Sequence, residues 1–253
     1  MKRKLTAALL ALFLAMPMAA CGSSQNDAKT LTIAMEGNWA PWTYHGDDGA
    51  LTGFDVEIGR GIAASMGAEP EFIEGEWDGL FAGMDAGRYD VVINGVDVTE
   101  ERREKYDFSE PYAYIKTVLV VRADNEDITS FDDLTGRTTA NSIGSTYELL
   151  AKGYGAEVLS VDTLDETMQM VLSGRADATL NAFVSVADYL SQHPNAAIKI
   201  IDETEEANQV AIPMPKGNET LLSEVNKGIA ELRESGKLKE LSEKYFGMDI
   251  TEP

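Results

Sequence analysis

The eight residues GRYDVVIN at positions 87–94 return as GRADATLN at positions 174–181. Both copies read G-R-x-D-x-x-apolar-N, and each follows a segment whose apolar residues have helical spacing. In each copy the glycine can end a helix, the Asp opens an apolar strand, and the Asn stands at the carboxyl end of that strand. A chance match between two common helix–glycine–strand junctions is the alternative. The repeat predicts two lobes of similar build.

Apolar runs and amphipathic segments alternate around the first copy. Strands are expected at 31–35, 72–73 and 90–94, and helices at 54–66 and 77–86. This order is typical of an α/β fold in which helices cover the faces of a mostly parallel sheet. A similar order surrounds the second copy, with strands expected at 138–141, 158–161 and 198–201 and helices at 147–152, 164–172 and 184–192.

The last part of the chain indicates how the lobes are connected. After residue 209 the chain is expected to return to the first lobe and to end in two amphipathic helices. The second lobe, 113–209, is therefore predicted to be inserted into the first, which comprises 30–112 and 210–253. Two crossings, near 112–116 and 205–210, would act as hinges beside a cleft between the lobes.

The N-terminus has the composition of an export signal. Three basic residues precede an apolar run at 5–20, which is shorter than the roughly 20 residues that a membrane-spanning helix needs. Residues 1–20 are therefore predicted to be a signal peptide. Cys21, the single cysteine, follows two small residues, which resembles the lipidation motif of bacterial lipoproteins, although Met18 replaces the usual Leu. We expect a lipidated Cys21 with a tether over 21–29, and hence an extracytoplasmic protein anchored to the cell membrane. Ordinary cleavage that leaves a free cysteine is the alternative.

The composition argues against several classes of function. The 253 residues carry 21 Lys and Arg against 43 Asp and Glu, and this net charge of −22 argues against nucleic acid as a partner. His45 and His193 are expected at the surface, and no Ser/His/Asp, Cys/His or metal-ligand spacing is visible. We therefore predict no enzymatic activity, no metal and no cofactor, and a monomeric protein.

The first copy of the repeat runs into a polar loop, NGVDVTEERREKYDFSEPY, at 94–112. Ligands of open α/β sheets bind at the carboxyl ends of strands, and this loop places Asp97, Thr99 and Arg102 there. Arg can grip a carboxylate with two parallel hydrogen bonds, so the loop is predicted to hold a small zwitterion. The alternative is a solvated, charge-mixed helical turn at 100–105.

Short motifs along the chain carry a family resemblance. They are WAPW at 39–42, GFDVEI at 53–58, WDGL at 77–80, GRYD at 87–90, TEER at 99–102, YDFSEPY at 106–112, GST at 144–146 and KYFG at 244–247. Together they resemble the polar amino-acid-binding proteins of bacterial ABC importers, over residues 30–248. The resemblance implies a two-lobed type II periplasmic-binding fold with two hinge strands. It also implies a receptor that delivers a polar amino acid to the permease subunits of an ABC transporter.

The resemblance implies ligand contacts from both lobes. In the family the Arg of the T-x-x-R motif, here Arg102, binds the α-carboxylate of the ligand with the help of backbone N–H groups. Gly95 would let the backbone approach closely, and Gly144-Ser145-Thr146 at a helix start would offer unpaired N–H groups to an anion. An ion pair between Arg102 and Glu100 or Glu104 is the alternative.

Other positions implied by the resemblance surround the side chain of the ligand. Trp39 and Trp77 match two flanking aromatic residues, and Trp would add cation–π attraction for a cationic ligand. Glu36 and Asn94 stand at strand ends, and Glu36 matches an acid that reads ligand polarity. Two core Trp residues and a solvated carboxylate are the alternatives. Trp42 is expected to pack the loop.

One position departs from the family. An Asp usually follows the second-lobe strand and pairs with the α-ammonium of the ligand, but Ala182 occupies that position. A desolvated ammonium without a partner is costly. Asp97 stands where relatives carry Ser or Thr, so we expect it to replace the missing carboxylate, with Asn181 as a neutral partner. The alternative is that Asp97 binds a second, distal amino group.

The sequence does not identify the ligand. Two acidic side chains and two Trp walls suit a polar or cationic amino acid with an extended side chain, with cystine as the first candidate and arginine and lysine as others. A dehydratase-like enzyme on the same fold and a ligand-sensing receptor domain are the alternative functions.

Overall fold

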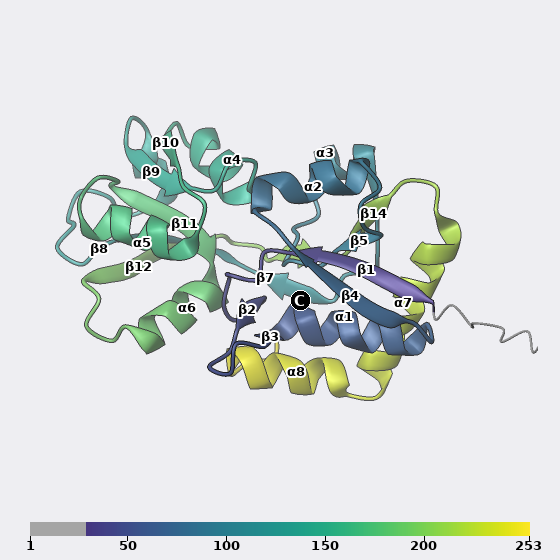
Figure 1. Ribbon diagram of the computed structural model, residues 1–253. Helices are drawn as coiled ribbons and strands as arrows, with labels where there is room; N and C mark the ends of the chain where they lie inside the picture. Colours follow the sequence, from purple (N-terminus) through teal and green to yellow (C-terminus); the bar gives the residue numbers. More distant parts are fainter. Residues whose placement is uncertain (1–28) are drawn as a thin grey trace, which may run out of the picture.

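The structure, a computed structural model, describes residues 29–253. The predicted signal peptide, Cys21 and most of the predicted tether lie outside the described residues. Two α/β lobes stand side by side and are joined by strands between them (Figure 1). None of the helices between residues 29 and 253 has the length and apolarity that a bilayer crossing requires.

The first lobe contains a three-stranded parallel sheet. Its strand order is β4 (Glu69–Glu74), β1 (Thr30–Met35) and β5 (Val91–Val92). Helix α1 (Phe54–Ser65) lies between β1 and β4 in the chain, and α2 (Trp77–Asp85) lies between β4 and β5. The strand–helix alternation that the apolar spacing predicts is therefore present in this lobe.

The second lobe contains a five-stranded mixed sheet. Its order is β10 (Glu157–Ser160), β9 (Thr138–Asn141), β11 (Ala178–Ala182), β8 (Thr117–Arg122) and β12 (Ile198–Glu203), and helices α4 (Thr146–Gly153), α5 (Leu164–Leu172) and α6 (Phe183–Gln192) complete the lobe. The expectation of a mostly parallel sheet holds here too, because β9, β10, β11 and β12 run in one direction and only β8 runs against them. The β8 strand enters from the hinge against the direction of β11, and apolar spacing alone carries no information on strand direction.

The repeated motif occupies the same place in each lobe. The units β1–α1–β4–α2–β5 and β9–α4–β10–α5–β11 both pair their third strand with their first in parallel. Oδ2 of Asp90 accepts a hydrogen bond from the N–H of Thr32 at 2.8 Å, and Oδ2 of Asp177 accepts from the N–H of Thr138, also at 2.8 Å. The leading glycine of each copy follows the preceding helix with φ of 69° and 70°. The sequence repeat is thus matched by a structural repeat.

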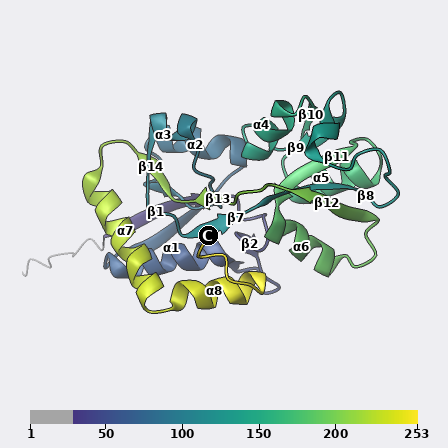
Figure 2. The same ribbon diagram turned by 180° about the vertical axis from the view of Figure 1, so that it is seen from behind.

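Two antiparallel strand pairs lie where the chain crosses between the lobes or approaches the crossing. β7 (Ala113–Ile115) pairs with β13 (Asn208–Val210), and β6 (Tyr106–Phe108) pairs with β14 (Pro213–Pro215). Figure 2 shows β7 and β13 side by side between the lobes. The predicted hinges fall in this region, and the residue bounds of the two lobes stay a prediction.

The end of the chain returns to the first lobe. Helices α7 (Glu219–Glu234) and α8 (Lys237–Phe246) pack on α1, and Figure 1 shows the yellow end of the chain beside the blue α1. Gly228 permits this close approach, because a Cβ there would lie 3.0 Å from the Cα of Ile62. The remaining elements are β2 (Tyr44–His45), β3 (Leu51–Thr52), α3 (Glu100–Lys105) and the 3-10 helix η1 (Phe131–Leu134).

An aromatic cluster forms part of the core of the first lobe. Trp42 is 1% exposed, and its ring packs against Phe54 with centroids 5.8 Å apart, so its predicted structural role is confirmed. Burial of one such side chain contributes about 2–3 kcal/mol.

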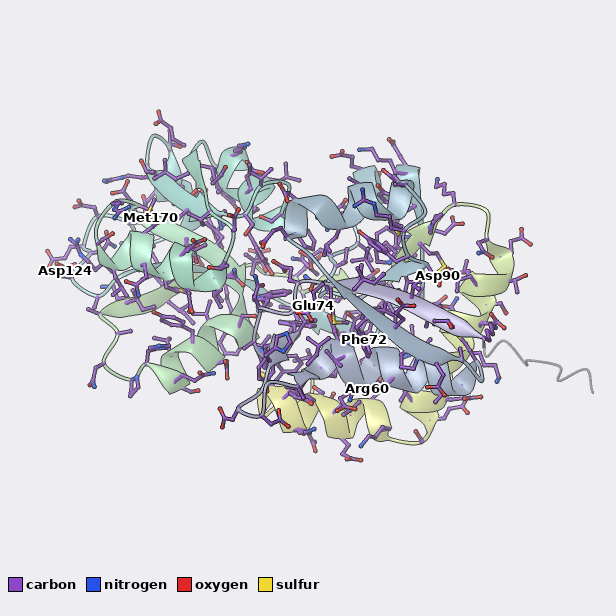
Figure 3. The ribbon with its side chains drawn as sticks, viewed as in Figure 1. Arg60, Phe72, Glu74, Asp90, Asp124 and Met170 are labelled. Atoms are coloured by element: carbon purple, nitrogen blue, oxygen red, sulfur yellow. The ribbon has the colours of Figure 1, made fainter. Side chains whose placement is uncertain are left out.

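On the surface of the same lobe, the guanidinium of Arg60 lies 5.6 Å from the ring centroid of Phe72 (Figure 3). His45 and His193 are both exposed, as expected.

Candidate functional site in the interlobe cleft

A cavity of about 520 Å³, its mouth included, is lined by residues of both lobes. Residues at the carboxyl ends of β1, β5, β9, β10 and β11 reach it, as the sheet rule predicts. The structure brings together all ten predicted ligand-binding residues, which are Glu36, Trp39, Trp77, Asn94, Gly95, Asp97, Arg102, Ser145, Thr146 and Asn181. It also adds Asn38, Ser142, Tyr147, Asp162, Thr163 and Leu164.

Sequence reasoning missed these six additional residues, although a signal was present for several. Ser142 follows β9 directly, and Asp162 and Thr163 follow β10 closely. The rule that selected Asn94, a polar side chain after a strand of a parallel sheet, applies equally to them. Tyr147 carried no comparable signal, because it lies within an amphipathic helix.

Arg102 is held in place by its own loop and by the second lobe. Its Nη1 donates to the backbone oxygen of Asp97 at 2.9 Å, and its Nη2 donates to the backbone oxygen of Gly144 at 3.2 Å. The guanidinium carbon lies 5.3 Å from the ring centroid of Trp77 and 5.2 Å from that of Phe81. Aromatic faces and carbonyls therefore fix the orientation of the fork.

Among the described residues, the charge of Arg102 has no ion-pair partner. Within residues 29–253 no carboxylate lies within 4.0 Å of the guanidinium nitrogens, so the alternative of a pair with Glu100 or Glu104 is not found. Burial lowers the pKa of Arg102, while the nearby Asp97 raises it. A half-buried guanidinium with remaining N–H donors is a site for an anion.

Asp97 is a buried carboxylate at the boundary of the two lobes. It is 7% exposed, and its Oδ2 accepts hydrogen bonds from the hydroxyl of Thr146 and, at 3.3 Å, from Nδ2 of Asn208. Its Oδ1 accepts no hydrogen bond from any described residue. Burial raises the pKa of Asp97 to about 6, and the Thr146 bond and Arg102 oppose that rise. Asn208, which comes from β13, had no signal in the sequence.

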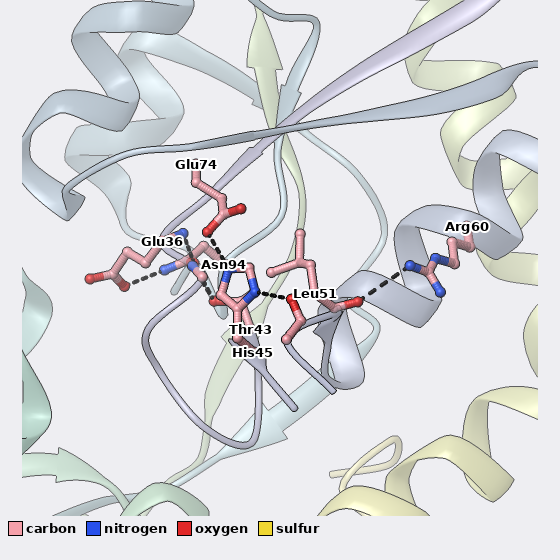
Figure 4. Close-up of polar contacts among 9 residues, drawn as sticks. Glu36, Thr43, His45, Leu51, Arg60, Glu74 and Asn94 are labelled. Atoms are coloured by element: carbon pink, nitrogen blue, oxygen red, sulfur yellow. Dashed lines mark hydrogen bonds and ion pairs between the residues drawn. The ribbon is translucent and has the colours of Figure 1, made fainter. Parts of the chain in front are cut away.

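Glu36 and Asn94 form a reciprocal pair at the strand ends of the first lobe (Figure 4). The N–H of Glu36 donates to Oδ1 of Asn94 at 2.8 Å, and Nδ2 of Asn94 donates to Oε2 of Glu36 at 2.6 Å. The hydroxyl of Thr43 also donates to Oδ1 of Asn94, at 3.2 Å. Burial raises the pKa of Glu36 to about 7, against the hydrogen bond from Asn94 and with a smaller contribution from Glu76.

The two Trp residues form walls of the cavity. Trp39 stacks on Trp42 with ring centroids 5.4 Å apart, so Trp42 sets its plane. Gly95 has a positive φ of 54°, and a Cβ there would lie 2.7 Å from the ring of Trp39. The close approach that Gly95 permits is therefore to Trp39. Trp77 is the first residue of α2 and stands over the guanidinium of Arg102.

The start of α4 offers fewer free N–H groups than expected. The N–H of Gly144 donates to Oε2 of Glu148 at 2.6 Å, and the N–H of Ser145 donates to the backbone oxygen of Ser142 at 3.2 Å. Both groups are consumed in closing the helix start, which corrects the expectation for this motif. The N–H groups of Thr146 and Tyr147 donate to no described acceptor, and they lie at the positive end of the helix dipole.

The wall formed by β11 carries no charge. Oδ1 of Asn181 accepts a hydrogen bond from the N–H of Ala182 at 2.9 Å, which fixes the orientation of the amide, and its Nδ2 donates to no described residue. Ala182 is 1% exposed and has no polar side chain. Asn181 thus presents a donor, so the expectation that it serves as a neutral partner for an ammonium needs revision: its amide suits an acceptor on the ligand.

The two lobes touch each other across the cleft. Arg102 bonds to Gly144, and Asp97 accepts from Thr146, as described above. A third contact joins Nε1 of Trp42 to the hydroxyl of Ser185 at 3.1 Å. The lobes are therefore closed on the cavity.

This architecture defines a class of protein. Two α/β lobes are joined by crossing strands, and the cavity between them holds the cation Arg102 and the carboxyls of Glu36 and Asp97. These are the features of a solute-binding protein that closes on a small ligand. The chain belongs to family 3 of the bacterial extracellular solute-binding proteins, whose profile its residues 31–248 match.

Relatives named as amino-acid-binding proteins span most of the chain. It is 40% identical over 224 residues to a probable amino-acid ABC transporter-binding protein of Haemophilus influenzae, covering 88% of this chain and 87% of that protein. It is 38% identical over 265 residues to the L-cystine-binding protein TcyA of Bacillus subtilis, covering 96% and 98%. These relatives are binding proteins, which agrees with the prediction that the chain is not an enzyme.

Two solved structures confirm the fold. An ancestral arginine-binding protein bound to arginine is 35% identical and gives a TM-score of 0.81, covering 86% of this chain and 98% of that one. The unliganded, open L-cystine solute receptor of Neisseria gonorrhoeae is 41% identical but gives only 0.61, covering 90% and 97%. The lobe arrangement of this chain is thus nearer to the arginine-bound structure, in agreement with its interlobe contacts.

Proposed function

We propose that this protein is an extracytoplasmic receptor that binds a polar amino acid between its lobes and delivers it to the permease of an ABC transporter. The observation that carries the proposal is the pair formed by Arg102 and Asp97. Arg102 is a half-buried cation without an ion-pair partner among the described residues, and Asp97 is a buried carboxylate whose Oδ1 accepts no hydrogen bond from them. An α-amino acid supplies an anion and a cation one carbon atom apart, which satisfies both groups at once.

Because Arg102 and Asp97 lie close together, they suit the α-carboxylate and the α-ammonium of the ligand. Arg102 would bind the α-carboxylate, assisted by the free N–H groups of Thr146 and Tyr147. Asp97 would bind the α-ammonium through Oδ1. We favour the α-ammonium over a distal amino group as the partner of Asp97, because Arg102 lies beside Asp97. Arg102 bonds to the backbone of Asp97 and lowers the pKa of its carboxyl.

The charge of the cavity favours a cationic ligand side chain. With Arg102 and Asp97 assigned to the α-carboxylate and α-ammonium, Glu36 remains as a half-buried carboxyl between the strand ends and the Trp walls. A lysine or arginine side chain would lie along Trp39 and place its charge near Glu36. A cystine molecule carries a second carboxylate, and Arg102 is the one cationic side chain among the described residues that line the cavity.

The relatives support both candidates by name. TcyA is named as an L-cystine-binding protein, whereas the solved ancestral protein is bound to arginine. We propose a basic amino acid as the preferred ligand and cystine as the second candidate, because the cavity offers a carboxyl for a second cation and no cation for a second carboxylate.

Isothermal titration calorimetry with L-arginine, L-lysine, L-glutamine and L-cystine tests the proposal. We expect L-arginine or L-lysine to bind at least tenfold more tightly than L-glutamine. Glu36→Gln should narrow that difference, since it removes the charge and keeps the shape. Tighter binding of L-cystine than of both basic amino acids would overturn the assignment of Glu36. Absence of binding by all four would overturn the proposed function.

The two-lobe architecture supports closure of the lobes around the ligand. We propose that the lobes, bounded near 112–116 and 205–210, open and close about these crossings, since a ligand with contacts in both lobes favours the closed arrangement. Small-angle scattering should show a smaller radius of gyration for the protein saturated with the amino acid that binds in calorimetry than for the ligand-free protein. An unchanged radius would contradict the hinge.

The sequence also supports a membrane anchor. We propose that Cys21 is lipidated after removal of residues 1–20 and that the following residues form the tether. Expression of the full chain with a radiolabelled fatty acid should label the protein, and Cys21→Ser should abolish the label and release the protein from the membrane fraction. Label retained in C21S would exclude this site.

A further inference from the structure

Asp55 is a fully buried carboxylate that does not line the cavity. It is 0% exposed and lies in the first turn of α1, within the GFDVEI motif. Burial raises the pKa of Asp55 to about 7, although hydrogen bonds from Tyr112 and Gly95 oppose the rise. Burying a carboxyl is costly, and an apolar residue of similar size would pack at lower cost. A buried carboxyl at this position therefore needs hydrogen-bond donors that offset its desolvation, and their identity shows what it connects.

The two oxygens of Asp55 connect the cavity wall to the start of the hinge. Oδ2 accepts a hydrogen bond from the N–H of Gly95 at 2.5 Å, and Oδ1 accepts one from the hydroxyl of Tyr112 at 2.8 Å. Gly95 lines the cavity and belongs to the loop that carries Asp97. Tyr112 is fully buried and directly precedes β7, the first strand between the lobes. One carboxyl thus joins the ligand-facing loop to the hinge strand.

The backbone of the same turn holds the aromatic wall. The N–H of Asp55 donates to the backbone oxygen of Trp42 at 3.0 Å, and the N–H of Phe54 donates to that of Pro41 at 3.0 Å. Gly53 has φ of 130°, and a Cβ there would lie 2.1 Å from the oxygen of Trp42, so only glycine fits. Because Trp42 stacks under Trp39, the turn that places Asp55 also places a Trp wall of the cavity.

We infer that Asp55 is a positioning residue for ligand binding, which fixes the Gly95–Asp97 wall relative to Tyr112 and the hinge. Movement of the hinge then carries Asp97 and Arg102 as one body with the aromatic wall. Loss of both acceptor oxygens would leave two buried donors unpaired and would let the wall shift relative to the hinge. The inference needs a ligand in this cleft but not its identity.

Two variants of Asp55 test the inference by calorimetry with L-arginine as the probe. Asp55→Ala removes both acceptors, and we expect at least a tenfold loss of affinity. Asp55→Asn can still accept from Gly95 and can donate to the hydroxyl oxygen of Tyr112, so we expect it to bind within threefold of the wild type. Rescue by Asn would show that the hydrogen bonds, rather than the filled volume alone, place the wall.

Asp90→Ala is the matched control. The carboxyl of Asp90 accepts one backbone N–H and one hydroxyl bond, both from Thr32, but at the amino end of β5, and Figure 3 shows it on the first lobe away from the second. We expect D90A to lose thermal stability as D55A does and to keep its affinity for L-arginine within twofold. Wild-type affinity in D55A, or an equal loss in D90A, would overturn the inference.

Two further measurements keep the test decisive. If D55A fails to fold, Tyr112→Phe removes one of the two bonds, and we expect about a threefold loss of affinity; no loss would count against the inference. In ligand-free protein labelled with ¹⁵N-glycine, the Gly95 amide should exchange slowly in the wild type and in D55N and rapidly in D55A. A rapidly exchanging Gly95 amide in the wild type would refute the positioning role even if L-arginine proves not to be a ligand.

Discussion

Asn94 and Asn181 end the same motif in the two lobes, yet their side-chain amides have different partners. Asn94 is 0% exposed, and both its polar atoms are bonded, to Glu36 and to Thr43. Asn181 is 7% exposed, its Oδ1 accepts a hydrogen bond from the N–H of the next residue, Ala182, and its Nδ2 donates to no described residue. Asn94 therefore has a structural role and positions Glu36, whereas Asn181 offers an N–H donor to the cavity.

The residues after each Asn continue this difference. In the first lobe the chain turns at Gly95 and adds Asp97 and Arg102, so that this lobe supplies both the cation and the carboxyls of raised pKa. In the second lobe Ala182 leads directly into α6, and the lobe contributes hydroxyl and N–H donors. Equivalent strand ends thus give equivalent positions, while the following residues decide the chemistry.

Removal of the Arg102 cation from the first lobe should reduce ligand affinity more than any other change. Arg102→Ala deletes the donors to the ligand carboxylate, and two hydrogen bonds to a charged group contribute about 3–5 kcal/mol together. We expect binding of L-arginine to weaken by more than about a hundredfold, as measured by calorimetry. Arg102→Lys is the matched control, because it keeps the charge but not the fork, and should recover only part of the loss. Wild-type affinity in R102A would place the carboxylate elsewhere.

Moving the carboxyl from one lobe to the other should have the next largest effect. Asp97→Ser leaves the ligand ammonium without a buried partner, at a cost of about 2–3 kcal/mol or roughly a fiftyfold loss of affinity. The double variant Asp97→Ser with Ala182→Asp places a carboxyl after the second Asn instead, and we expect it to regain at least half of that free energy. Ala182→Asp alone is the control. Equal affinities of D97S and the wild type would exclude both roles considered for Asp97.

The two Asn residues should respond differently to the same substitution. Asn94→Ala removes several buried hydrogen bonds, so we expect the free energy of unfolding to fall by about 2–3 kcal/mol. Asn181→Ala removes one hydrogen bond, from the N–H of Ala182, so it should cost less stability than Asn94→Ala, and loss of the donor that faces the cavity should weaken ligand binding by about threefold to fivefold. Chemical denaturation and calorimetry on both variants give the comparison. Equal stability losses in the two variants would show that the lobes use their Asn alike.

The pH dependence should come from the first lobe and should be the smallest effect. The pKa of Glu36 is raised from 4.5 to about 7, so its protonated form favours folding, and this contribution is lost as the pH rises from about 4.5 through 7. Relative to Glu36→Gln, the ligand-free wild type should therefore melt at progressively lower temperature across this range.

Binding should show the opposite trend with pH. Ionised Glu36 attracts a cationic side chain, so the affinity for L-arginine should rise several-fold from pH 6 to pH 8 in the wild type beyond any rise in E36Q. Asn181→Ala, on the neutral wall, should retain the wild-type trend. Identical pH profiles of the wild type and E36Q would remove Glu36 from ligand recognition.

Much of the fold could be predicted because its signals are local. Apolar spacing marks the helices α1, α5 and α8, and glycines mark where helices end. Glu36, Asn94 and Asn181 reach one cavity because parallel strands align their carboxyl ends, a rule that needs no knowledge of distant contacts. The Trp residues and the start of α4 were predicted from the family resemblance instead. The reversed direction of β8 could not be predicted, because an apolar strand has the same pattern in either direction.

The partners of the site residues could not be predicted, because they come from distant parts of the chain. Asn208 reaches Asp97 from 111 positions away, and Asp55 reaches Gly95 from 40 positions away. Hydrogen bonds across such separations depend on how lobes and strands are placed, and polar residues in short strands carry no signal of their partner. The occupied N–H groups at the start of α4 were missed for a similar reason, since Glu148 folds back on its own helix start.

The sequence by itself determined the alternation of helices and strands and the polar residues at several strand ends, because periodicity and strand ends are properties of short segments. The resemblance of its motifs to a family added the Trp walls and the role of Arg102. Only the tertiary structure decided which polar atoms are already bonded and which face the cavity unpaired. In the structure Asn94 is bonded to Glu36, the Nδ2 of Asn181 donates to no described residue, and the Oδ1 of Asp97 accepts no hydrogen bond from any described residue. That distinction rests on desolvation and on contacts between lobes, which exist only once the chain has closed on itself.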